Sequence, residues 1–142
     1  SGKVAERWKI EAVLALVRAV PYERFVIAGL GNPQGKTRRF MQLVGFNSRQ
    51  VHETDRLRFA RFQYSAGPLP DDKGRPHDVW VFGAYIPMYE VYVKLAAFFS
   101  SGCVQAVCVS FHEAGIDCPI RTEGRDPNLA ETVRTICDAC YN

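Results

Sequence analysis

A continuous apolar run from residue 104 to residue 111 constrains the fold of this chain more than any other feature. A strand that is apolar on both of its faces is typical of an internal strand of a sheet. A shorter apolar run at 25–28 leads directly into Gly29-Leu30-Gly31, which predicts a buried strand followed by a tight turn. The chain is therefore expected to build a sheet around these two strands.

The remaining elements follow from periodicity. Apolar residues recur every four positions over 4–20, which predicts an amphipathic helix that Pro21 ends. A hairpin of two strands is expected over 58–82, because alternating aromatic residues, a turn-rich segment and a further apolar run follow one another. Three further segments have helical spacing: 37–47, 88–100 and 128–140. Strands that alternate with helices in this order predict an α/β fold, three-layer α/β/α with a mixed sheet.

The length of 142 residues suits a single domain, 1–142. We divide it into an N-terminal helical extension, 1–22, and the main α/β unit, 23–142. Apolar residues make up 47% of the chain, which is enough to form a core. No run of 18 apolar residues occurs in the sequence, so no membrane is expected among its partners. The charges behind Ser1 also do not fit a signal peptide.

The number of cysteines is odd, and the chain is not a small disulfide scaffold: Cys103, Cys108, Cys118, Cys137 and Cys140. This usage indicates mostly buried thiols in a reducing, intracellular compartment, the cytoplasm or the mitochondrial matrix. Cys137 and Cys140 have the spacing of zinc ligands, but the sequence has no second pair of this kind. Packing of both side chains is the preferred interpretation, so no metal site is expected.

Cations gather in one part of the chain, although the net charge is only +3. Seven of them lie between positions 36 and 61: Lys36, Arg38, Arg39, Arg49, Arg56, Arg58 and Arg61. Such a segment suits phosphate groups of a nucleic acid, and the other interpretation is a solvated helix face. The two interpretations differ in whether the cations share one face.

The glycine-rich stretch that follows the first strand ends in Gly35-Lys36-Thr37. A nucleotide-binding P-loop requires four residues between its glycines. Gly31 to Gly35 leaves three residues and Gly29 to Gly35 leaves five. Pro33 also removes a backbone N–H group from the segment that would surround the phosphates. No nucleotide cofactor is therefore expected.

Three ordered segments carry a family resemblance. The first is an apolar strand that ends in Gly29-Leu30-Gly31-Asn32-Pro33, with Thr37-Arg38 after a short loop. The second is an apolar strand followed by residues 85–89, and the third is an apolar strand ending in His112, with Asp117 and Pro119 in register. Over residues 24–140 these motifs resemble the bacterial-type peptidyl-tRNA hydrolase family. The N-terminal helix has no counterpart in that family.

The resemblance assigns roles to individual positions. In the family a histidine acts as general base on a water, a carboxylate orients the histidine, and an asparagine positions the substrate. The corresponding catalytic positions here are Arg39, Glu113 and Asn32. Phe40 stands where the family has a further asparagine. The substrate or RNA contacts are expected from Lys36, Arg38, Met88, Tyr89 and Asn128.

The arginine at position 39 decides the functional expectation. A guanidinium stays protonated at any accessible pH and cannot take a proton from water. Loss of a general base typically costs about 10²–10⁴-fold in rate. We therefore expect a pseudoenzyme that binds RNA (tRNA or rRNA) or a ribonucleoprotein partner and is ribosome-associated, with Arg39 and Glu113 forming an ion pair in place of the catalytic dyad.

Two alternatives remain at this point. The first is an active peptidyl-tRNA or related ester hydrolase, in which His52, His77 or His112 replaces the missing base. The second is a protein-interaction module with no RNA role. For His77 a solvated turn is the preferred interpretation, and for His112 a structural role.

Overall fold

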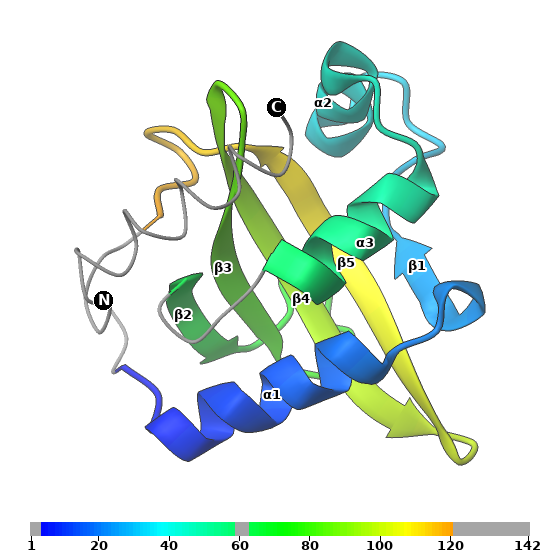
Figure 1. Ribbon diagram of the computed structural model, residues 1–142, viewed down its shortest axis with the longest axis vertical. Coiled ribbons are helices and arrows are strands. Elements are labelled where there is room, and N and C mark those ends of the chain that lie inside the picture. The colour runs from blue at the N-terminus through cyan, green and yellow to red at the C-terminus, as the bar shows by residue number, and fades with distance from the viewer. Residues whose placement is uncertain (1–3, 59–62, 121–142) are drawn as a thin grey trace.

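The computed structural model describes residues 4–58 and 63–120 (Figure 1). Its elements in chain order are α1 (Arg7–Ala19), the 3-10 helix η1 (Tyr22–Arg24), β1 (Phe25–Ile27), α2 (Lys36–Val44), α3 (Ser48–Arg58), β2 (Tyr64–Leu69), β3 (Val79–Ile86), β4 (Tyr89–Ser100) and β5 (Cys103–Glu113). The helix predicted at 128–140 lies outside the described residues.

The five strands form one sheet in the order β1-β5-β4-β3-β2. β1 runs parallel to β5, whereas every other neighbouring pair is antiparallel. The fold is therefore α/β with a mixed sheet, as predicted, and it is compatible with a three-layer arrangement. β5 lies between β1 and β4, which confirms the internal position expected from its apolar run.

Helices α1 and α3 pack against each other on one face of the sheet (Figure 1). α1 contacts β4 and β5, and α3 contacts β3. The amphipathic helix predicted over 4–20 is confirmed, but its buried side is formed by Ile10, Val13 and Val17. Val4 and Trp8, which begin the four-residue repeat, are exposed. α2 lies at the end of the sheet beside β5, and Gly45 ends it in the left-handed conformation at φ 74°.

The predicted helix at 88–100 is wrong, because this segment is strand β4. It pairs with β3 on one side and with β5 on the other along most of its length. Pro87 and Met88 form the turn from β3, and Met88 adopts a positive φ of 74° there. Pairing on both sides fixes an extended chain, because the backbone N–H and C=O groups of buried strands need partners.

The predicted start of the hairpin at residue 58 is also wrong. α3 occupies Ser48–Arg58, and β2 begins only at Tyr64. A capping box begins α3: Gln50 N donates to Asn47 Oδ1 at 2.9 Å, and Asn47 N donates to Gln50 Oε1 at 2.8 Å. The hairpin itself is confirmed, since β2 and β3 are antiparallel neighbours.

Thr37 attaches the first turn of α2 to β5. The Phe111 backbone N–H donates to Thr37 Oγ1 at 3.1 Å, and both groups are buried. Replacing Thr37 with Val is expected to lower the free energy of unfolding by about 1–3 kcal/mol, because a buried N–H group loses its acceptor. Chemical denaturation measures this. Thr37→Ser keeps the acceptor and should lose less, and equal losses in both variants would contradict the account.

Asp55 of α3 is fully buried, and neither of its carboxyl oxygens has a hydrogen-bond partner of good geometry among the described residues. Burial raises the pKa of Asp55 well above its usual value, although the neighbouring Cys108 thiol partly opposes this. The folded state therefore holds a proton that the unfolded chain releases above pH about 4.

The contribution of Asp55 to stability is thus expected to be full below that pH and to fall as pH rises toward the pKa of folded Asp55. Asp55→Asn should flatten this dependence. Thermal unfolding across pH measures it, with the exposed Asp78→Asn as control. The same pH dependence of stability in the wild type and in Asp55→Asn would contradict the assignment.

Candidate functional site

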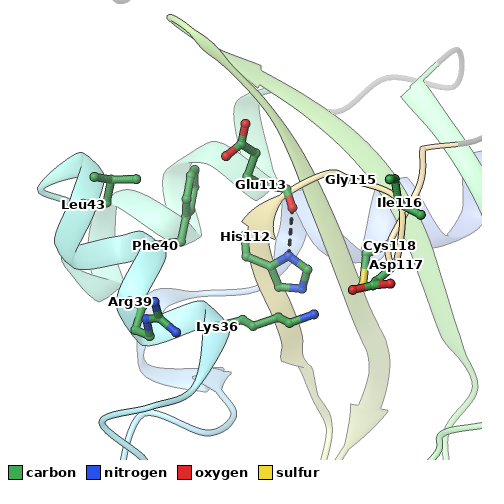
Figure 2. A pocket seen from close by; sticks show the side chains of 10 residues that line it. All are labelled: Lys36, Arg39, Phe40, Leu43, His112, Glu113, Gly115, Ile116, Asp117 and Cys118. Carbon is green, nitrogen blue, oxygen red and sulfur yellow. Dashed lines mark hydrogen bonds between the residues drawn. The ribbon is translucent and has the colours of Figure 1, made fainter.

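The candidate site lies where the parallel strands β1 and β5 end. Their carboxyl ends meet at one edge of the sheet, where α/β proteins commonly bind ligands. Two adjoining pockets open there. The helix pocket, of about 500 Å³, lies between α2 and residues 112–118 (Figure 2). The loop pocket, of about 260 Å³, lies beside the glycine-rich loop. Lys36 and His112 line both pockets.

The glycine-rich loop is held by its own backbone. Asn32 N donates to Gly29 O at 3.2 Å, and Gly35 N donates to Asn32 O at 3.0 Å. A Cβ on Gly35 would lie 3.2 Å from Asn32 O, so the loop closes tightly at this position. Arg38 donates from Nη1 to Leu30 O at 3.1 Å, which fixes the loop from the helix side. The Arg38 side chain is thus engaged in supporting the loop.

The loop pocket combines several features that favour an anion. Gly35, the N-cap of α2, provides no side-chain cap, and Gly35, Lys36 and Thr37 all line the pocket. The N–H groups and the partial positive charge of a helix start attract anions. Lys73 and Arg75 reach the same pocket from the loop between β2 and β3.

Asp71 holds that second loop in place. Its Oδ1 accepts a hydrogen bond from Lys73 N at 2.7 Å, and Arg75 Nη1 lies 3.0 Å and 3.1 Å from the two carboxylate oxygens. In the described part of the chain, neither the Lys36 nor the Lys73 ammonium forms an ion pair. Both ammonium groups therefore remain available to a ligand.

His112 is buried between the two pockets. Its Nδ1 lies 3.1 Å from Glu113 O, a carbonyl that can only accept, so Nδ1 carries the proton and Nε2 keeps a lone pair (Figure 2). The ring stacks on Tyr92 at 5.4 Å between centroids. Burial and the nearby Lys36 lower the pKa of His112, although its bond to Glu113 O opposes this. The imidazole is therefore neutral at pH 7.

Arg39 and Glu113 both line the helix pocket, as the resemblance implied. The expected ion pair between them is wrong: none joins these two residues in the structure, and Figure 2 shows the Glu113 carboxylate pointing away from the Arg39 guanidinium. Phe40 is buried and meets Tyr89 edge to face at 5.4 Å. Tyr89 thus packs against α2 instead of opening a helix.

The other predicted site residues do not all lie in the two pockets. Asn32 and Lys36 line the loop pocket. Met88 lies in the β3–β4 turn with 93% of its surface exposed and lines neither pocket. Asn128 lies outside the described residues.

The described cations of segment 36–61 do not form one surface, and Arg61 lies outside the described residues. Arg49 lies over the Tyr22 ring of η1 at 4.1 Å, and Arg56 donates from Nε to Arg18 O of α1 at 3.1 Å. Lys36 and Arg39 instead line the pockets. The long basic surface considered from the sequence is therefore replaced by a compact cationic site at the loop pocket.

Lys73, Arg75 and Ser110 were not predicted as site residues, and a structural role was preferred for His112. Lys73 and Arg75 belong to a turn-rich segment whose residues carry no functional signal of their own. Their place in the site comes from the return of the β2–β3 loop to β5. For His112, the available signals were its position at the end of an apolar strand and its place in the third motif of the resemblance.

Comparisons with protein-family models, curated proteins and solved structures find no match for this chain. None of the helices within 4–58 and 63–120 is long and apolar enough to cross a membrane. The same residues contain no group of three His, Cys, Asp or Glu side chains suited to a metal ion. Function is therefore inferred from the site itself.

Proposed function

We propose that this chain binds RNA through the sugar–phosphate backbone at the loop pocket. The observation that carries the proposal is the convergence of Lys36, Lys73 and Arg75 on a pocket that also contains the uncapped start of α2. Phosphate contacts from lysine, arginine and helix N-termini supply most of the affinity in nucleic-acid binding. tRNA or rRNA, alone or within a ribonucleoprotein, is the expected partner.

We further propose that the domain is peptidyl-tRNA hydrolase-like and lacks the general base of that family. Support comes from the strand, the Gly-Leu-Gly-Asn-Pro loop and helix α2, which place Asn32 beside the parallel strand β5. Arg39 occupies the base position in the helix pocket and cannot accept a proton. β4 replaces the expected helix, so no role is carried over to Met88 or Tyr89. The domain would then act in translation by binding, as a ribosome-associated protein.

One observation favours hydrolysis of an RNA-linked ester as a second candidate function. His112 is neutral, its tautomer is fixed by Glu113 O, and Nε2 retains a lone pair beside both pockets. A neutral imidazole of this kind meets the chemical requirement for a general base. The candidate requires that a water and the ester reach Nε2.

The Lys36→Ala/Lys73→Ala double variant tests RNA binding. Titration with labelled tRNA should show weaker binding and a salt slope that is smaller by roughly one unit for each phosphate that is no longer neutralised. Arg7→Ala/Lys9→Ala on exposed α1 is the matched control, since it also removes two cations, and it should leave both values unchanged. Equal binding by the double variant and the wild type would refute the loop pocket as the RNA site.

A further inference from the structure

A third pocket, here called the base pocket, lies on the sheet face that carries Tyr92 and His112. It has a volume of about 310 Å³. Its walls are apolar and come from two neighbouring strands: Ala96, Phe98, Val107 and Val109. The loop between β2 and β3 closes it with Asp71, Arg75 and His77. Of the residues that line the base pocket, Arg75 alone is also one of the proposed phosphate contacts.

The base pocket adjoins the loop pocket. Arg75 and Val109 line both of them. A β-bulge in β5 places Val109 between the two pockets. Lys94 pairs with Ser110 and Leu95 pairs with Cys108, so Val109 is left as an extra residue without a partner in β4. Bulges of this kind redirect side chains at binding sites. A ligand whose anionic group occupies the loop pocket therefore has an apolar pocket next to that group.

The chemistry of the base pocket suits a flat ring. The His77 ring stacks on Phe98 with 3.7 Å between centroids and 8° between planes, so planar groups already pack face to face here. Arg75 is held by both oxygens of Asp71, which fixes its guanidinium at the boundary between the two pockets. Aromatic rings and arginine planes are the groups on which unpaired RNA bases stack.

We infer that the base pocket receives the base of a nucleotide whose phosphate lies in the loop pocket, so that the chain binds single-stranded RNA. This inference rests on the proposed RNA function and makes it more specific. A base within a duplex is stacked and paired and cannot enter, whereas an unpaired base can. The pocket walls are apolar and aromatic, and stacking on such walls tolerates different bases, so weak sequence preference is expected.

The experiment compares short oligoadenylate with an abasic oligomer of the same length and charge. The wild type should bind oligoadenylate about 5- to 150-fold more tightly, the range that one stacked base contributes. Phe98→Ala should remove this difference. Phe99→Ala is the matched control, since Phe99 is the next residue of β4 but points to the other side and is 68% exposed. Its affinities should match those of the wild type.

A second measurement uses the unaltered protein, so that it does not depend on the folding of Phe98→Ala. Oligoadenylate should shift the ring proton resonances of His77, and the abasic oligomer should shift them less. Equal affinity of the wild type for both oligomers, or unchanged His77 resonances with oligoadenylate, would overturn the base pocket alone. Failure of the abasic oligomer to bind at low salt would overturn the phosphate site.

Discussion

Replacing Phe111 with Ala is expected to lower the free energy of unfolding by about 3–5 kcal/mol, which is the usual cost of removing a buried aromatic ring. Phe111 has no exposed surface. Its ring lies 5.9 Å from that of Phe40 and 6.2 Å from that of Phe46, between centroids. The substitution would leave a cavity between α2 and the sheet, because Phe40 belongs to α2 and Phe46 follows shortly after its end.

Equilibrium denaturation with urea measures this cost. Phe99→Ala serves as control, because an exposed side chain usually changes stability by less than about 0.5 kcal/mol. A loss below about 1 kcal/mol in Phe111→Ala would show that α2 does not pack on β5 as described, since such a loss is typical of a much less buried ring.

Peptidyl-tRNA hydrolysis is expected to be slower by about 10²–10⁴-fold than in an enzyme that has the histidine base. The reason is Arg39, whose guanidinium cannot accept a proton. A single-turnover assay with an N-blocked aminoacyl-tRNA measures the rate. Arg39→His should not restore a full rate, because the Glu113 carboxylate points away from position 39 and offers no partner to orient an imidazole there (Figure 2).

Rapid cleavage by the wild type would contradict the pseudoenzyme proposal. In that event His112→Gln tests whether His112 is the general base, as the second candidate function requires. Glutamine keeps a similar size and hydrogen-bonding capacity but is no base. Loss of the rapid cleavage in this variant would assign the base to His112. Full recovery by Arg39→His would show that the rest of the family site is present.

The strands with the strongest apolar signal could be predicted from the sequence. The runs at 25–28 and 104–111 became β1 and β5. β5 is internal, as its apolar run indicated, whereas β1 is at the edge of the described sheet and its Val26 is exposed. Segment 88–100 was ambiguous: Val91, Leu95 and Phe98 have helical spacing, whereas burial of Val91, Val93 and Leu95 follows the alternation of a strand. Pairing with β3 and β5 decided in favour of a strand. A local sequence pattern does not show which segments pair in the folded chain.

α3 escaped prediction for a different reason. Its buried residues include the polar His52, Thr54 and Asp55, so an apolar stripe is hardly visible in the sequence. The His52 ring is accommodated by a contact of 2.8 Å between Nε2 and Val20 O. Asn47 and Gln50 did carry a start signal, because this spacing allows a reciprocal cap.

The candidate site was predicted in part. Asn32 lies in the loop after β1, and Glu113 is the last residue of β5. Lys36 and Arg39 belong to the first turn of α2, which follows that loop, and strand ends of parallel neighbours meet in space. Lys73 and Arg75 enter the site through a loop that returns from the β2–β3 hairpin, and Asp71 fixes their position. That return depends on tertiary structure, which explains why these two residues could not be assigned from the sequence.

The salt dependence of tRNA binding tests the central proposal most directly. Titration of the wild type with labelled tRNA at a series of salt concentrations gives the slope of log K against log salt. Neutralisation of one phosphate in the loop pocket by Lys36 and Lys73 predicts a slope of roughly −0.7 for a single-stranded segment. A slope near zero, or no binding at low salt, would contradict an RNA phosphate site in the loop pocket.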